Sequence, residues 1–212
     1  MAPKLRLLHS EAPAAEPEHT DKELLETFDG TDGSSDRRQK LYDHLIRVVE
    51  GTIFRVLGER GPEHEDLVQA AFEQILVTLR DGRFGKGCSL KAWAASISTN
   101  LALNALRSRG VQRRYFDRGS DAERQMPRVH ADDNPESSVM LRRALAELRT
   151  ALASLPPDSA QALLLHDAFG YELSEIAVIV GASLAAVQSR VVRARRELRR
   201  KLEANQPQEG DS

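Results

Sequence analysis

The most informative chemistry in the sequence is a run of basic residues near its C-terminal end. Residues 190–201 hold seven Lys or Arg and one Glu. The segment that carries them follows a shorter helical pattern, and Gly181 and Ser183 lie between the two. Gly181 can take the left-handed backbone that reverses the chain, and Ser183 can cap the helix that follows. This pattern predicts a helix-turn-helix, a motif that lays its second helix in the major groove of DNA.

The second helix of this motif has two distinct faces. An apolar stripe recurs at helical spacing and is predicted to pack inward, and it consists of Val187, Val191, Ala194 and Leu198. The polar side chains that point away from it are Gln188, Ser189, Arg190 and Arg193. Arginines near phosphates release counterions and give a salt-dependent affinity for DNA. The alternative from the residues alone is a solvated basic helix at the end of a bundle.

A second polar face lies on the predicted helix over residues 89–114. It is spaced by four, four and three residues, and it consists of Ser96, Asn100, Asn104 and Arg107. Trp93 borders this face, and Arg109, Arg113 and Arg114 follow with no acid among them. An aromatic ring, amides and arginines on one face suit single-stranded DNA, because bases stack on rings and amides pair with exposed base edges. The alternative is that Trp93 is a core residue and the amides face water.

Helices must position these side chains, and the apolar spacing predicts an all-α chain. Aromatic residues make up only 5% of the sequence, so the core rests on aliphatic residues, which favours helices over a sandwich. Apolar residues recur every three or four positions from Asp36 to Gly58, and again over 63–80 and 89–114. Four more helices are predicted over 135–154, 158–169, 173–180 and 184–204.

The distribution of charge indicates two modules. Residues 37–116 carry a net charge of +6 and residues 140–204 a net +3, while the connector between them is acidic. We therefore predict two small helical domains, over 36–116 and 138–204, joined by a flexible acidic linker over 117–137. Residues 1–35 are predicted to be a disordered acidic extension, in which Leu24, Leu25 and Phe28 have the spacing of one short helical turn. Residues 205–212 are predicted to be a disordered tail.

Composition also excludes several classes of protein. The only cysteine is Cys88, so an internal disulfide and a multi-cysteine zinc site are ruled out. No signal peptide or membrane-spanning run is visible, and we expect a cytoplasmic protein without membrane insertion. No set of nucleophile, base and orienting group is visible, and no phosphate loop or metal cluster. We therefore expect no enzyme activity, no cofactor and no metal.

Two stretches of the sequence resemble regions of one family. The first comprises Glu65-Asp66-Leu67-Val68-Gln69, Phe84, Ser89-Leu90-Lys91-Ala92-Trp93, Asn100-Leu101-Ala102 and Leu106-Arg107. The second comprises Leu155-Pro156-Pro157, Gly170, Glu175-Ile176-Ala177, Gly181, Ser183, Ser189-Arg190 and Arg193-Ala194-Arg195. They resemble regions 2 and 4 of the extracytoplasmic-function (ECF) sigma factors of the sigma-70 family, in the right order. One departure is Glu172, where the family usually has a capping Ser.

The resemblance implies a sigma factor that binds core RNA polymerase, recognises −35 and −10 promoter elements and promotes DNA melting for transcription initiation. It implies −10 contacts by Arg83, Phe84, Lys91, Trp93, Asn100, Asn104, Arg107, Arg109 and Arg113. It implies −35 contacts by Ser183, Leu184, Ala186, Gln188, Ser189, Arg190 and Arg193. It implies polymerase contacts by Asp66, Leu67, Gln69, Phe72 and Gln74. An anti-sigma factor is a further candidate partner.

The main alternative is a stand-alone helix-turn-helix regulator that acts without core polymerase. Such a regulator does not need the face formed by Trp93 and Asn100, or the second basic block. It usually carries a ligand or receiver domain, and no such domain is visible in this sequence.

Overall fold

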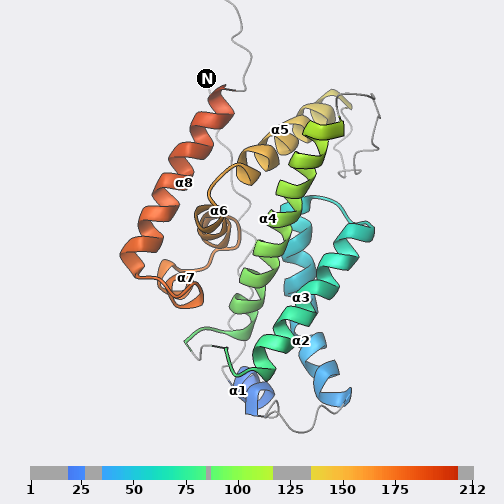
Figure 1. The fold of residues 1–212 in the computed structure, drawn as a ribbon, viewed down its shortest axis with the longest axis vertical. Helices are drawn as coiled ribbons and strands as arrows, with labels where there is room; N and C mark the ends of the chain where they lie inside the picture. Colours follow the sequence, from blue (N-terminus) through green and yellow to red (C-terminus); the bar gives the residue numbers. More distant parts are fainter. Residues whose placement is uncertain (1–18, 27–34, 85–86, 117–134, 205–212) are drawn as a thin grey trace, which may run out of the picture.

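The computed structural model describes residues 19–26, 35–84, 87–116 and 135–204. Within these ranges every regular element is helical, as predicted (Figure 1). The elements are α1 (His19–Glu26), α2 (Ser35–Leu57), α3 (Pro62–Arg80), α4 (Leu90–Phe116), α5 (Pro135–Ala153), α6 (Pro157–Leu163), the π-helical turn η1 (Leu164–Ala168), α7 (Leu173–Ile179) and α8 (Leu184–Ala204). The expected linker over 117–137 and the tail over 205–212 lie largely or wholly outside the described residues, and α5 already begins at Pro135.

The N-terminal half is built from α2, α3 and α4, which pack on one another. Leu45, Val49 and Ile53 of α2 are fully buried, as are Ile75 of α3 and Leu103 of α4. The spacing of four and eight residues from Leu45 to Val49 and Ile53 places all three on one face, as the apolar periodicity predicted. α3 begins at Pro62, where the missing amide has no intrahelical partner to lose.

A short helix lies inside the extension that we expected to be disordered. α1 spans His19–Glu26 and packs against α2, and it contains Leu24 and Leu25, two of the three residues whose spacing predicted a short helical turn. Leu24 and Leu25 lie against the hydrophobic core. A helix this short depends on packing, and its two apolar side chains gain burial from a surface that the rest of the fold supplies.

The C-terminal half is built from α5, α6, η1, α7 and α8, and its fully buried side chains include Leu165, Ile176 and Val187. The predicted helix over 158–169 divides into α6 and the π turn η1, in which the Phe169 amide donates to the Leu164 carbonyl at 3.0 Å. No single helix among the described residues is both long and apolar enough to cross a bilayer. The pair α7 and α8 has the length and composition only when taken together, across a bend of 107°.

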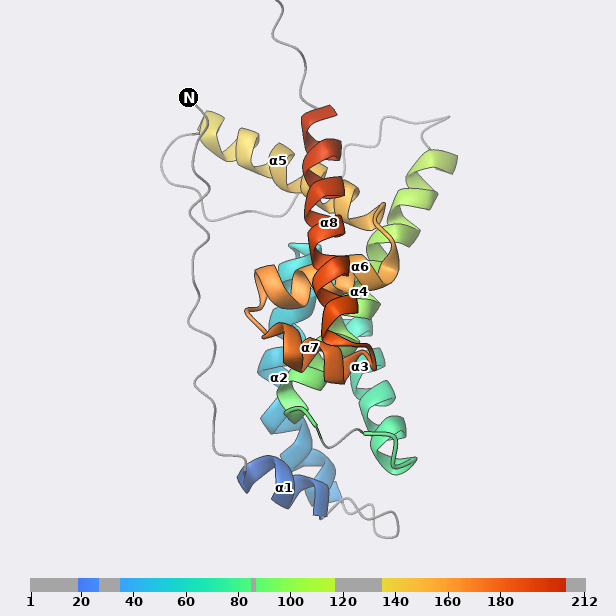
Figure 2. The same cartoon turned by 90° about the vertical axis from the view of Figure 1, so that its left-hand side faces the viewer.

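The two halves share one core, and α4 is the helix common to both. α4 packs on α2 and α3 and also on α5, α6, η1 and α7 (Figures 1 and 2). Its buried side chains are mostly small, and they include Ala92, Ala94, Ala95, Ser98, Thr99 and Ala102. Small side chains let neighbouring backbones approach a helix from every direction. The two predicted domains are thus packed together here rather than apart.

Arg149 of α5 crosses between the halves and lies on the end of α2. Its Nε donates to the Val56 carbonyl at 3.1 Å. Its guanidinium fills the space beside Gly58, which has a φ of +79°. A side chain at Gly58 would collide with this guanidinium and would also adopt a strained backbone conformation.

We predict that Gly58→Ala lowers the free energy of unfolding by about 1–3 kcal/mol, because it adds left-handed backbone strain and displaces Arg149. The matched control is Gly51→Ala, in the interior of α2, where an added Cβ meets nothing within 4 Å. This control should leave stability unchanged or raise it by up to about 1 kcal/mol. Urea denaturation followed by circular dichroism measures both, and equal midpoints for the two variants would contradict the analysis.

Candidate nucleic-acid interface

The turn between α7 and α8 has the geometry of a helix-turn-helix. The two helix axes are bent by 107°, within the range of such pairs. Gly181 has a φ of +63°, and Ser183 Oγ accepts a hydrogen bond from the Ala186 amide at 3.2 Å. The reversal and the cap predicted from Gly181 and Ser183 are confirmed. Glu172, which precedes α7, makes no side-chain cap hydrogen bond.

α8 buries one face and exposes the other. Val187, Val191 and Ala194 are buried, which confirms this part of the predicted stripe. Of the side chains predicted to meet duplex DNA, the exposed ones are Ser183, Leu184, Gln188, Ser189 and Arg193. Ala186 and Arg190 are half-buried. α8 therefore exposes polar side chains near its N-terminal end, together with the apolar side chain of Leu184.

The arginines of α8 differ in how firmly they are held. Arg190 pairs with Asp158 in the first turn of α6, with 3.0 Å between Nη2 and Oδ2. Arg195 makes two hydrogen bonds to Asp167 of η1, and the pKa of Arg195 is raised by them. Arg193 Nε donates to the Ser189 carbonyl of its own helix at 3.2 Å. Arg193 is thus an exposed cation of α8 that, among the described residues, bonds to a backbone carbonyl and forms no ion pair.

The polar face of α4 divides into an open part and a closed part. Asn100 and Asn104 are exposed, as predicted. Arg107 turns toward the C-terminal half, where its guanidinium donates to the carbonyls of Ala153 and Leu155 at 3.2 and 3.5 Å. It also donates to Asn104 Oδ1 at 3.0 Å. In this arrangement the Arg107 guanidinium bonds to the end of α5 and does not point toward a ligand on the open part of α4.

Ser96 lies on the same face of α4 as Asn100, but the expectation that it is open to a ligand is wrong. Its side chain is only 5% exposed. Gln161 of α6, itself buried, donates from Nε2 to Ser96 Oγ at 2.7 Å and lies 3.3 Å from the Ser96 carbonyl. The helical period placed Ser96 correctly beside Asn100. The helical period could not reveal that α6 covers the face of α4 at Ser96.

The two remaining arginines predicted on α4 are Arg109 and Arg113. Arg109 forms ion pairs with Glu59 and Glu63, at 2.5 Å each. Burial alone would lower the pKa of Arg109, but the two glutamates outweigh this effect and the net shift is upward. Its charge is therefore already balanced within the N-terminal half. The side chain of Arg113 lies outside those that the structure describes.

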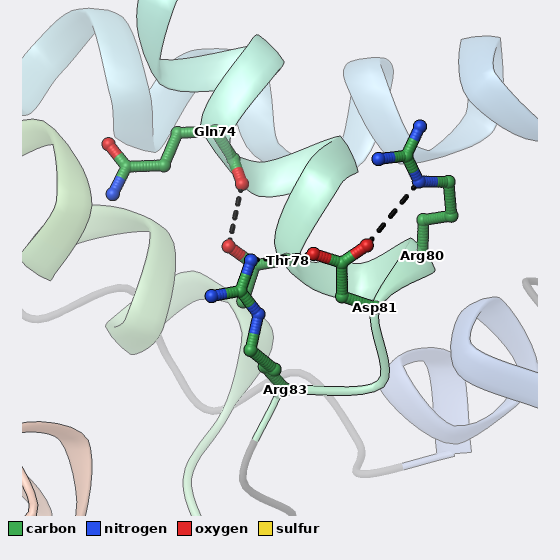
Figure 3. Close-up of polar contacts among 5 residues, drawn as sticks. All are labelled: Gln74, Thr78, Arg80, Asp81 and Arg83. Carbon is green, nitrogen blue, oxygen red and sulfur yellow. Dashed lines mark hydrogen bonds and ion pairs between the residues drawn. The ribbon is translucent and has the colours of Figure 1, made fainter.

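The loop after α3 is held by the charges at its start. Asp81 receives a hydrogen bond from Arg83 at 2.6 Å and a longer one from Arg80 at 3.4 Å (Figure 3). The hydrogen bond from Arg83 is the main reason that the pKa of Asp81 is lowered. The Arg83 amide donates to the Thr78 carbonyl at 3.0 Å. Arg83 is exposed, so it remains at the surface although it is anchored.

Two aromatic rings lie where this loop meets α4. Phe84 and Trp93 are half-buried, with ring centroids 5.0 Å apart in an edge-to-face arrangement. Such a pair is favourable because the positive edge of one ring meets the negative face of the other. Lys91, in the first turn of α4, is half-buried. Trp93 thus packs on the core, as the alternative interpretation predicted. It is only half-buried, so part of it is also accessible to a ligand.

The residues predicted to contact polymerase lie on α3. Asp66, Gln69 and Gln74 are exposed and Leu67 is half-buried. Phe72 is buried and packs on the ring of Tyr42, with the centroids 4.6 Å apart. Phe72 therefore supports this surface from beneath rather than forming it. Tyr42, which is 41% exposed, is the aromatic side chain that reaches the surface, and the sequence analysis missed it.

Three polar residues that join distant elements were also missed. They are Gln161, Arg149 and Asp21, which contact α4, α2 and the start of α4 respectively. Gln161 interrupts an apolar stretch, and this was the only signal that it might be buried. Among the described residues, no three His, Cys, Asp or Glu side chains come close enough to hold a metal ion.

Two family descriptions match the chain, and together they cover both halves. "Sigma-70 region 2" matches residues 41–114, which contain most of α2, α3 and most of α4. "Sigma-70, region 4" matches residues 141–198, from α5 to α8. The two matches follow one another in the order of the regions identified from the sequence motifs.

Individual relatives agree with this assignment. The chain is 32% identical to the ECF RNA polymerase sigma factor SigE of Mycolicibacterium smegmatis, over 74% of this chain and 60% of SigE. It is 31% identical to the RNA polymerase sigma factor CarQ of Myxococcus xanthus, over 79% of this chain and 90% of CarQ. The structure of CnrH in complex with the cytosolic domain of CnrY has a similar fold, with a TM-score of 0.52 and 21% identity, over 88% of this chain and 99% of that one. Both halves of the structure and both relatives thus lead to one assignment: the chain is a member of the sigma-70 family, of the ECF type.

Proposed function

We propose that this ECF-type chain directs core RNA polymerase to promoters by reading a −35 element with α8 and capturing a melted −10 element with α4. The observation that carries the proposal is that the chain exposes two separate DNA-compatible surfaces. One is the capped, polar N-terminal part of α8, and the other is the face of α4 near Asn100. A stand-alone regulator needs only the first surface, so the presence of the second favours a sigma factor.

Reading of the −35 element rests on the exposed side chains of α8. Gln188, Ser189 and Arg193 are exposed beside the N-terminal end of the helix, which is the part that reaches base edges in a helix-turn-helix complex. Arg190 is oriented by Asp158. An arginine held by a carboxylate is ordered before it meets DNA, so less entropy is lost on binding.

Capture of the −10 element rests on Asn100, Asn104 and the pair formed by Phe84 and Trp93. The two amides can hydrogen-bond to unpaired base edges, and the accessible side of the Trp93 ring can stack on a base. Stacking on a ring contributes about 1–3 kcal/mol per base. Opening one base-pair step costs about 1.4 kcal/mol. Melting is therefore driven by tighter binding of unpaired bases than of paired ones, without any covalent step.

The contact with core polymerase is proposed to lie on α3. Asp66, Gln69 and Gln74 share its exposed surface, next to the exposed ring of Tyr42, which packs on Phe72. CnrH is found in complex with the cytosolic domain of CnrY. By analogy we extend the proposal to a protein inhibitor of this chain, an anti-sigma factor.

The packed arrangement of the two halves must open before both promoter elements are bound. Positions −35 and −10 are about 25 base pairs apart, which is about 85 Å along B-DNA. α6 packs on both α4 and α8, and packed helix axes are about 8–10 Å apart, so α8 lies within about 20 Å of α4. α7 also touches the loop that precedes α4, since a Cβ at Gly87 would meet Val178 Cγ1 at 2.7 Å. The structure thus corresponds to a closed form of the chain.

We predict that Arg193→Ala reduces promoter-dependent run-off transcription with core polymerase by about 5- to 100-fold, the range of one base-edge contact. The matched control is Arg143→Ala, which removes the same charge from an exposed position on α5. The control should transcribe like the unmodified chain. Equal activity of the Arg193 and Arg143 variants at every salt concentration would contradict the placement of the recognition helix.

We predict that Asn100→Ala depresses open-complex formation while circular dichroism and affinity for core polymerase stay unchanged, because the Asn100 side chain is exposed and lies away from α3. The measurement is permanganate reactivity of −10 thymines on duplex promoter, compared with transcription from a pre-melted bubble. Rescue by the bubble places Asn100 in melting, and partial rescue places it in capture of the single strand. Equal defects on both templates would exclude Asn100 from both steps.

The closed form makes a separate prediction about Cys88. The pKa of Cys88 is raised to about 11, first by burial and then by the charges of Glu175 and Asp21. Glu175 belongs to α7, so separation of the halves removes its charge and part of the burial. Because the thiolate is the reactive form, a lower pKa speeds alkylation, by up to about 100-fold at pH 8 if the full two-unit shift is lost.

Gln161→Ala deletes the buried hydrogen bonds to Ser96. We predict that it speeds iodoacetamide alkylation of Cys88 and that the pH at which the alkylation rate is half-maximal falls below about 11, the pKa of Cys88 in the closed form. The matched control is Gln39→Ala, an exposed glutamine that bonds only within α2. Mass spectrometry of the intact protein measures the rates. Identical pH profiles for the Gln161 and Gln39 variants would show that these hydrogen bonds do not hold the halves together.

A further inference from the structure

The start of α4 is held by a side chain of α1, which is far from it in sequence but close to it in space. Asp21, on α1, accepts a hydrogen bond at Oδ2 from the Leu90 amide at 2.8 Å, although the two residues are 69 positions apart in sequence. Its other oxygen, Oδ1, lies 3.0 Å from His44 Nε2 of α2. The Asp21 and His44 side chains are only 23% and 10% exposed. One carboxylate thus links α1, α2 and α4.

This contact completes the N-terminal cap of α4. Ser89 Oγ accepts from the Ala92 amide at 3.1 Å, and the Ser89 carbonyl accepts from the Trp93 amide at 3.1 Å. The Leu90 amide has no such local acceptor, and the first amides of a helix depend on side chains or water. Asp21 supplies the acceptor, and its negative charge also suits the positive end of the helix dipole. Leu24 and Leu25 keep α1 in place by packing on the core.

The cap lies at the junction that carries the proposed −10 surface. Leu90 is fully buried, and it separates the loop with Arg83 and Phe84 from the helix with Trp93. The start of the loop is anchored by Asp81 and by the Thr78 carbonyl. Its end is anchored by Asp21. If the second anchor is lost, the first turn of α4 can fray, and Trp93 lies in that turn.

We propose that Asp21 is a positioning residue for −10 capture: by capping α4 from α1 it fixes the first turn of α4 and the edge-to-face pair of Phe84 and Trp93. This inference rests on the proposed function for its consequence at promoters, but not for its structural part. Asp21 itself does not touch DNA. Asp21 lies in α1, within the acidic N-terminal extension. In this proposal α1 therefore supports the surface that captures the −10 element.

The structural part can be tested in the full chain without polymerase, because Trp93 is the only tryptophan. Asp21→Ala should shift Trp93 emission to the red and increase acrylamide quenching at temperatures where circular dichroism shows a folded chain. Asp21→Asn should restore both signals, since its amide oxygen still accepts from Leu90 and its NH₂ can donate to neutral His44. The matched control is Asp36→Ala, an exposed acid that pairs only with Lys40 of its own helix, and it should leave emission unchanged.

The functional part uses core polymerase and a promoter with reactive −10 thymines. Asp21→Ala should reduce the amount of open complex about five-fold, the factor that corresponds to the loss of one helix cap. Asp21→Asn should keep the amount of open complex unchanged. Unchanged emission in Asp21→Ala, or a transcription defect that Asp21→Asn does not rescue, would overturn the positioning role. If the unmodified chain supports no transcription, the proposed function fails, and the emission of the three variants still decides whether Asp21 positions Trp93.

Discussion

The close approach of other helices to α4 is the packing constraint on which the rest of the structure depends. α4 is lined with small buried residues such as Ala94, Ala95, Ser98 and Ala102, so α2 and α3 pack on it from one side and α5, α6 and α7 from the other. Larger side chains there would hold one group of helices away. Among the described side chains of α4, the exposed Asn100 and Asn104 and the half-buried Trp93 are therefore accessible to a ligand while the chain is closed.

The same packing determines which positive charges are available to DNA. Arg107 is held by backbone carbonyls, Arg109 by two glutamates, and Arg190 and Arg195 by aspartates. An arginine that is already paired inside the chain releases fewer counterions when DNA binds, so the salt dependence should be weaker than the number of basic residues suggests. Exposed residues with uncommitted hydrogen-bonding groups, such as Gln188 and Asn100, then matter more for the sequence that is read.

Besides the shared core, polar contacts join the two halves, and each of these is weak enough to be exchanged for a contact with a partner. A buried hydrogen bond such as that between Gln161 and Ser96 contributes about 0.5–1.5 kcal/mol net. Arg107 and Arg149 donate to backbone carbonyls that water can also satisfy once the halves separate. A polymerase surface or an inhibitor that binds one arrangement better than the other shifts the balance by its difference in affinity. In the proposed function, closure and promoter binding are then alternative states of one equilibrium.

Local sequence determined the helices, the turn at Gly181, the cap at Ser183 and the exposed amides of α4, because each depends on spacing or on backbone geometry within a few residues. The motifs of regions 2 and 4 likewise identified the family. Only the tertiary structure decided that Ser96 is buried, that Phe72 lies beneath Tyr42, and that Arg107 faces the end of α5. It alone decided that Asp21 caps α4 across 69 residues. Helical periodicity assigns a residue to a face of its own helix, but what covers that face is set by elements far away in the sequence.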